Sequence, residues 1–203
     1  MEAFNTFITN IYPYIAVTIF LLGSWLRYDH GAYTWRAASS QMLSPRGMWF
    51  ASNVFHIGII FLILAHIVGV VAFGSVSDWP LTVSFVCGFL ILIGGGYLVL
   101  RRLGNVRVRI TSNRSDTLVI ALLVLMAILG LVMTEMKDMA PYVIEHYPDA
   151  MEPYLKGTVD VAILHRALGW TILAIFPFTR LVHIWSIPLG YLFRRYQLVR
   201  ARR

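Results

Sequence analysis

The sequence predicts an all-α integral membrane protein with five transmembrane helices. Of its 203 residues, 58% are hydrophobic and only 13% are charged, whereas a soluble domain is usually about half apolar and about a quarter charged. The charged residues gather in short clusters between long runs of Leu, Ile, Val and Phe. Because these runs lack the polar–apolar alternation of a transmembrane strand, a β-barrel is disfavoured.

Four long stretches contain no Asp, Glu, Lys or Arg, and a fifth apolar stretch near the C-terminus carries Arg166 and Arg180. A helix needs about 20 mainly apolar residues to cross the hydrocarbon core of a bilayer. No internal repeat or second domain is evident, so we expect one membrane domain over residues 1–203. The expected helices are approximately 4–26, 49–73, 79–100, 116–134 and 159–187. The proline-containing loop 135–158 is expected to be a short irregular or partly helical cap.

Most of the basic residues lie at one predicted end of the helices. They fall between spans one and two, between spans three and four, and in the C-terminal tail: Arg27, Arg36, Arg46, Arg101, Arg102, Arg107, Arg109, Arg114, Arg194, Arg195, Arg200, Arg202 and Arg203. The positive-inside rule then predicts a periplasmic N-terminus and a cytoplasmic C-terminus. The net charge of +7 therefore reflects orientation and attraction to anionic lipid rather than binding to nucleic acid.

Four of the six histidines lie inside expected helices. His56 and His66 are on the second span and His165 and His183 on the fifth, whereas His30 and His146 fall in loops. Polar groups in lipid are costly and usually functional. A single membrane histidine is often satisfied by an interhelical hydrogen bond, but two pairs on two helices favour ligation. Zinc and di-iron sites need closely spaced carboxylate or Cys partners, and the chain has one cysteine, Cys87.

The order of the histidines in depth predicts how they pair. Spans two and five run in opposite directions, so His56 should lie level with His183, and His66 with His165. As continuous helices, the ten-residue and eighteen-residue gaps would span about 15 and 27 Å. Helix tilt and a bend at Pro177 must absorb the difference. This geometry permits two stacked bis-histidine haems, with a relay of bare histidines as the rival interpretation.

Two further features accompany the fifth and third spans. Arg180 precedes His183 by three residues, so both fall on one helix face, where Arg180 would pair with a haem propionate or extend to the headgroups. Arg166 would meet a propionate or the outer interface. The Gly94–Gly96 run in span three permits close approach of another helix or of a flat macrocycle, and we favour helix packing.

Several long motifs resemble the γ subunit of the membrane-bound respiratory nitrate reductase. They cover most of the chain and include both expected ligand regions. The matching segments are IYPYIA at 11–16, GSWLRYD at 23–29, YTWRAASSQML at 33–43, ASNVFHIG at 51–58, FPFTRLVHIWS at 176–186 and YQLVRAR at 196–202. The sequence departs from the family pattern between Gly74 and Gly88, where it has no lysine to meet a quinone oxygen.

The resemblance implies a cytochrome b subunit with two b-type haems, in a bacterial or archaeal cytoplasmic membrane. It implies His56 and His183 as axial ligands of the cytoplasmic-side haem, and His66 and His165 as ligands of the periplasmic-side haem. It also implies an iron–sulfur β subunit and a molybdenum-containing catalytic α subunit, both docked on the cytoplasmic side. The expected function is oxidation of membrane quinol near the His66/His165 haem and electron transfer inward, with nitrate reduced in the α subunit.

Two rival functions follow from the same features. One is a quinol-oxidising cytochrome b anchor for a different iron–sulfur oxidoreductase. The other is a haem-free membrane scaffold that docks a soluble complex through its arginine-rich face. A transporter is disfavoured because no inverted repeat or pair of broken helices appears in the sequence.

Overall fold

The structure, a computed structural model, is built from helices, with no strand among the residues it describes (2–31, 43–44, 46–71 and 79–186). Within this part of the chain, five helical stretches are long and apolar enough to cross a membrane. The elements are α1 (Glu2–Asn10), α2 (Tyr12–Gly31), α3 (Met48–Val71), α4 (Trp79–Gly104), α5 (Val106–Thr111), α6 (Arg114–His146), η2 (Pro148–Ala150), α7 (Met151–Ile175), η3 (Phe176–Phe178) and η4 (Arg180–Ser186). The predicted all-α, five-span fold class is confirmed. Arg36 and the tail arginines Arg194, Arg195, Arg200, Arg202 and Arg203 lie outside the described residues.

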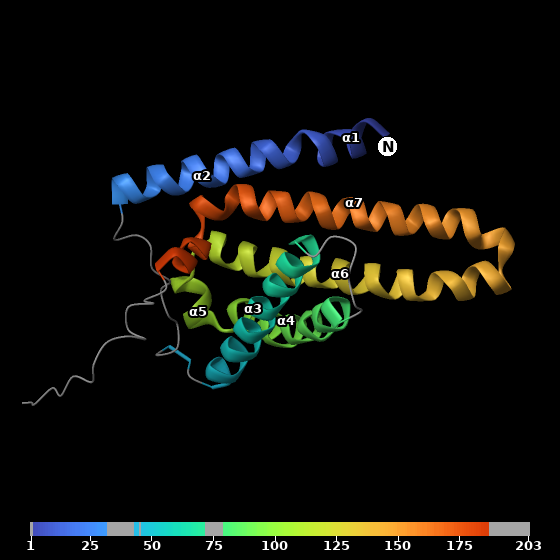
Figure 1. The fold of residues 1–203 in the computed structure, drawn as a ribbon. Coiled ribbons are helices and arrows are strands. Elements are labelled where there is room, and N and C mark those ends of the chain that lie inside the picture. Colours follow the sequence, from blue (N-terminus) through green and yellow to red (C-terminus); the bar gives the residue numbers. More distant parts are fainter. Residues whose placement is uncertain (1, 32–42, 45, 72–78, 187–203) are drawn as a thin grey trace, which may run out of the picture.

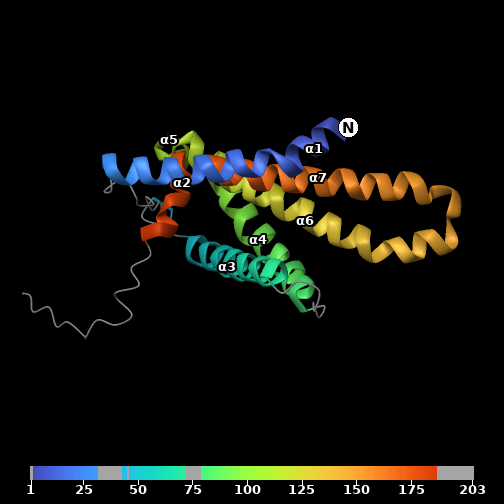
Figure 2. The same cartoon turned by 45° about the horizontal axis from the view of Figure 1, so that its top comes forward.

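The helices pack in a chain of neighbours. α3 packs along α4, α4 along α6, α6 along α7, and α2 along α7, and α6 and α7 form a long hairpin (Figures 1 and 2). A cluster of buried apolar side chains joins α3, α4 and α6 around Phe55, Ile91 and Ile120. A second cluster joins α6 to η3 and η4 around Val119 and Val182. The second cluster ties the segment that carries His183 to the start of α6.

Large apolar side chains cover much of the outer surface. On α3 alone, Ile60, Phe61 and Ile67 are each more than half exposed. Water-soluble proteins rarely present such continuous apolar surface, whereas lipid tails are an apolar solvent for it. The exposed faces of these helices are therefore the faces expected to contact lipid.

Gly94 allows α3 and α4 to pack with their backbones in close contact. A Cβ at Gly94 would lie 2.6 Å from the Phe55 backbone nitrogen and 2.7 Å from the Ala51 carbonyl oxygen. Both obstacles are backbone atoms, so only separation of the helices would relieve the clash. Helix packing therefore explains Gly94. At Gly96, two residues away, a Cβ would meet nothing within 4 Å.

Gly94→Ala is expected to destabilise the protein by about 1–3 kcal/mol, the usual cost of overpacking. Gly96→Ala is the matched control, because it should gain up to about 1 kcal/mol from improved helix propensity. Thermal unfolding in detergent, followed by circular dichroism, measures both variants. Equal unfolding temperatures for the two variants would contradict the close packing of α3 on α4.

The fifth span is not the continuous helix 159–187 that the sequence predicts. α7 begins at Met151 and ends at Ile175, and two short 3₁₀ helices follow. The cause is Pro177, which lacks an N–H and clashes with the preceding turn, and Thr179 then adopts an extended conformation (φ −119°, ψ 180°). His165 on α7 and His183 on η4 therefore do not lie on one continuous helix. The predicted bend at Pro177 is a full helix break.

Arg27 of α2 supports this break. Its guanidinium donates hydrogen bonds to the carbonyl oxygens of Pro177 (2.6 Å) and Thr179 (2.9 Å). Carbonyl groups released from a helix inside a membrane need such partners, because lipid offers none. Gly23 lies one turn earlier, where a Cβ would approach the Pro177 ring to 2.9 Å. α2 therefore fixes the position at which the chain turns into η4.

The predicted cap over 135–158 is also more regular than expected. α6 continues to His146 and α7 begins at Met151, so only a short 3₁₀ turn interrupts the hairpin. Pro141 lies inside α6, and Tyr154 of α7 donates a hydrogen bond across the hairpin to the Met136 carbonyl oxygen (2.6 Å). Contacts between the two helices stabilise helical structure that the local composition does not favour.

Two histidine pockets at different levels of the helices

The structure brings the four predicted site histidines together as two pairs. His56 and His183 line one pocket, which we call the arginine pocket because Arg101, Arg102 and Arg180 also line it. His66 and His165 line a second pocket, which we call the neutral pocket. His56 and His66 are ten residues apart on α3, so they lie about 15 Å apart along its axis. These are the two pairs predicted from the order of the histidines along spans two and five.

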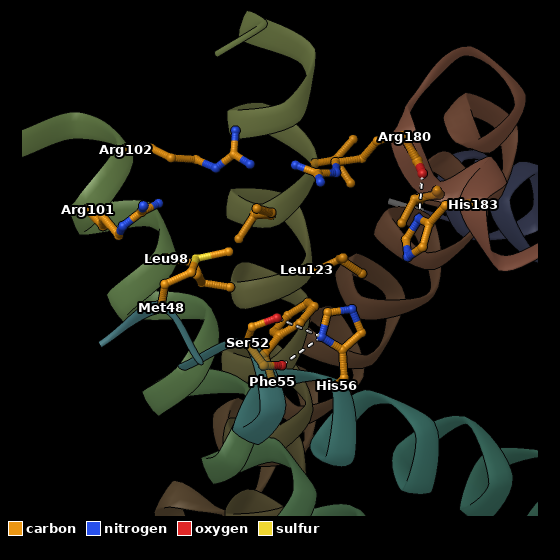
Figure 3. A pocket seen from close by; sticks show the side chains of 13 residues that line it. Met48, Ser52, Phe55, His56, Leu98, Arg101, Arg102, Leu123, Arg180 and His183 are labelled. Carbon is orange, nitrogen blue, oxygen red and sulfur yellow. Dashed lines mark hydrogen bonds between the residues drawn. The ribbon is translucent and has the colours of Figure 1, made fainter. Parts of the chain in front are cut away.

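The two imidazoles of the arginine pocket face each other across a gap (Figure 3). Their ring centroids are 6.4 Å apart, and the ring planes are inclined by 80°. A metal–imidazole nitrogen bond is about 2 Å long and the ring centroid lies about 1 Å behind that nitrogen, so two imidazoles on opposite sides of one ion have centroids about 6 Å apart. The observed separation suits two ligands of a single metal ion.

Backbone hydrogen bonds fix the orientation of three of these rings. The Nδ1 atoms of His56, His66 and His183 lie 2.6, 2.8 and 2.6 Å from carbonyl oxygens in the preceding turn. Each Nδ1–H donates to its carbonyl, which leaves Nε2 with a lone pair for a metal. His30 and His146, both exposed, make the same kind of bond to Leu26 and Tyr142. The hydrogen bond alone is therefore not diagnostic, and the pairing at a pocket is what distinguishes the four.

Each pair combines an exposed imidazole on α3 with a half-buried one from the other side. His56 and His66 are exposed, whereas His165 and His183 are half-buried. His165 Nδ1 is buried and has no hydrogen-bond partner. In a membrane an unsatisfied polar group is costly. A ligand that bridged each pair would cover the exposed ring and satisfy its Nε2.

The neutral pocket lies among uncharged, mostly apolar side chains. None of its described lining residues is Asp, Glu, Lys or Arg. Gly130 of α6 faces His165, and a Cβ there would lie 3.2 Å from the imidazole Cε1 atom. Ser84 and Thr134 are the hydroxyl side chains in the lining, and Thr134 donates its hydrogen bond to the Gly130 carbonyl oxygen (3.0 Å). Glycine at position 130 therefore keeps space beside the ring.

The arginine pocket is strongly cationic although it lies among apolar side chains. Arg101 and Arg102 at the end of α4 are 9% and 7% exposed, and Arg102 and Arg180 extend toward each other from opposite sides (Figure 3). Arg101 donates a hydrogen bond to the Ser44 carbonyl oxygen (2.6 Å). Asp116 of α6 forms ion pairs with Arg180 (3.5 Å) and Arg102 (3.9 Å). The buried Arg102 NH1 has no hydrogen-bond acceptor, so the pocket suits an additional anion.

Arg166, the other arginine within the fifth span, lines neither histidine pocket. Arg166 donates a hydrogen bond from NH1 to the Thr9 hydroxyl of α1 (2.8 Å). Arg166 therefore links α7 to α1. From the sequence, Arg101 and Arg102 are predicted only to mark orientation, and Asp116 is not among the predicted site residues. The one available signal for the two arginines is their position directly at the end of a span, at the same expected depth as His56.

The side chains that line the arginine pocket are of the types that bind a haem. Two opposed imidazoles supply the axial ligands of a bis-histidine iron, and the Arg102 and Arg180 guanidinium groups match the two carboxylates on the edge of the macrocycle. The described residues contain no cluster of three His, Cys, Asp or Glu that suits a zinc or di-iron site. The neutral pocket offers a second imidazole pair but no arginine among its described lining residues.

The fold and the two pockets define a multi-pass, all-α membrane protein with paired histidines at two levels. The family model for the nitrate reductase gamma subunit matches residues 5–202, and the chain belongs to this family. It is 44% identical to the respiratory nitrate reductase 1 gamma chain and 43% identical to the respiratory nitrate reductase 2 gamma chain of Escherichia coli, over the full length of each chain. It is 30% identical to the nitrate reductase gamma chain of Bacillus subtilis, covering 95% of this chain and 96% of the relative.

Proposed function

We propose that this chain is the diheme cytochrome b subunit of a respiratory nitrate reductase. In this role it takes electrons from membrane quinol at the end that holds His66 and His165. It passes them to an iron–sulfur subunit at the end that holds His56 and His183, and a molybdenum-containing subunit reduces nitrate. The observation that carries the proposal is the presence of two imidazole pairs at separate pockets along the helices of a nitrate reductase gamma subunit.

The residues of the two pockets have distinct roles in this proposal. His56 and His183 hold one iron through Nε2, and His66 and His165 hold the other. Arg180 and Arg102 neutralise the carboxylates of the group in the arginine pocket. Two b-type haems bound in this way supply one-electron transfer between the two ends of the helices. The carbonyl groups of Ser52 and Leu62 orient the α3 imidazoles and increase their basicity as ligands.

The arginine-rich end is proposed to face the cytoplasm, with the N-terminus in the periplasm. Arginine clusters between spans one and two, between spans three and four and in the tail support this orientation. An electron moving inward then works against a membrane potential negative inside, at about 2.3 kcal/mol per 100 mV. The fall in energy from quinol to nitrate must supply this work. Anionic lipid headgroups would surround the same arginines.

The partner subunits supply the chemistry that this chain lacks. With one cysteine in the whole sequence, the chain has no thiolate set for an iron–sulfur cluster. The cluster and the nitrate site must therefore belong to other chains, which are proposed to dock at the arginine-rich end. The relatives' designation as gamma chains is in keeping with an assembly of several subunits.

Rates of nitrate reduction in membranes that contain the assembled complex test this function. A reduced quinol analogue and a soluble dye that reduces the partner subunits directly serve as alternative electron donors. We expect His66→Ala to lower the quinol-driven rate to that of membranes lacking this chain, while the dye-driven rate stays unchanged. A quinol-driven rate equal to that of the unmodified complex would contradict the proposed function. A quinol-reduced complex that nitrate fails to reoxidise would instead favour a different iron–sulfur oxidoreductase.

A further inference from the structure

Asp116 places a carboxylate beside two of the three arginines that line the arginine pocket. It lies in the first turn of α6, and its ion-pair partners come from α4 and η4: Arg102 at 3.9 Å and Arg180 at 3.5 Å. The three side chains are only 20%, 8% and 19% exposed, respectively. Charges this shielded interact more strongly than surface pairs, and removing one member leaves the others uncompensated.

An acidic residue in the first turn of a helix has an ordinary structural explanation. It interacts favourably with the positive end of the helix dipole. That explanation does not account for the two arginines, which come from different elements and line the pocket of His56 and His183. Asp116 links the end of α4 to η4, the segment that carries His183, through one carboxylate. It therefore sets both the position and the net charge of the cationic side of the pocket.

We propose that Asp116 is a positioning residue that tunes the redox group of the arginine pocket. This inference rests on the proposed function. Reduction of a bis-histidine haem removes one positive charge from the site, so a nearby carboxylate favours the oxidised form and nearby arginines favour the reduced form. Asp116 adds a negative charge, and its ion pairs with Arg102 and Arg180 compete with the haem carboxylates for these two guanidinium groups. Both effects favour the oxidised form of the His56/His183 haem and leave the His66/His165 haem unaffected.

A redox titration of Asp116→Asn in the assembled complex, without nitrate, tests the proposal. A unit charge about 10 Å from a redox centre, at an effective dielectric constant of about 20, changes the reduced-to-oxidised ratio roughly tenfold. We expect that ratio to rise about tenfold for the His56/His183 haem at a fixed ambient potential. The ratio for the His66/His165 haem should stay the same. Asp29→Asn is the matched control, because Asp29 is 73% exposed and water screens its charge.

Asp116→Glu keeps the charge and should leave both ratios close to those of the unmodified complex. Should Asp116→Asn fail to fold, Asp116→Gln is titrated in its place with the same expectation. Unchanged ratios in a neutral variant that retains both haems would overturn the inference, as would an equal change at both haems. An unmodified chain without haem would instead overturn the proposed function, so the two failures are distinguishable.

Discussion

His56→Ala and His183→Ala are each expected to remove the haem of the arginine pocket. His66→Ala and His165→Ala are each expected to remove the haem of the neutral pocket. The reason is geometric, because each pair lines its own pocket and a six-coordinate iron loses affinity when one axial ligand is gone. The reduced-minus-oxidised absorption of each purified variant should fall to half that of the unmodified chain. The remaining haem should have the same midpoint potential within each pair of variants and a different one between pairs.

His30 and His146 provide matched controls for these variants. Both rings make the same Nδ1 bond to a carbonyl four residues earlier, but neither lines a histidine pocket. His30→Ala and His146→Ala should therefore retain both haems. If His56→Ala and His183→Ala left haems with different potentials, the assignment of the two pairs would be wrong.

Gly130→Leu is expected to remove the haem of the neutral pocket alone. Even a Cβ at this position lies 3.2 Å from His165, so a leucine side chain fills the space beside the ring and displaces whatever the ring binds. The haem-to-chain ratio should fall by half, and the surviving haem should match that of His66→Ala in potential. Quinol-driven nitrate reduction should fall to the same background level as in His66→Ala.

The control for steric bulk is Gly96→Leu. Gly96 lies on α4, lines neither histidine pocket, and a Cβ there would meet nothing within 4 Å. This variant should retain both haems and full activity. Retention of both haems in Gly130→Leu would show that the neutral pocket does not bind haem beside His165.

The sequence alone predicts the fold class and the grouping of the histidines for simple physical reasons. Apolar runs of about 20 residues have few structural solutions in a bilayer. Two spans that run in opposite directions place the early histidine of one level with the late histidine of the other. That rule brings His56 to His183 and His66 to His165, although the fifth span is broken rather than continuous.

The sequence does not predict features that depend on contacts between distant segments. Pro177 signals a bend, but the extent of the break depends on Arg27, which satisfies the released carbonyl groups from α2. Arg101 and Arg102 resemble ordinary orientation signals until the structure shows them buried in the arginine pocket. Likewise, no local pattern marks Asp116, because its two partners are 14 and 64 residues away in the chain.

The stoichiometry of haem to chain in the purified protein tests the central claim most directly. Extracted haem, quantified against amino-acid analysis of the same sample, should give two haems per unmodified chain. It should give none when all four pocket histidines are replaced by alanine and the helical content is retained. A folded unmodified chain that carries no haem, or a fourfold variant that keeps its full haem content, would contradict the account.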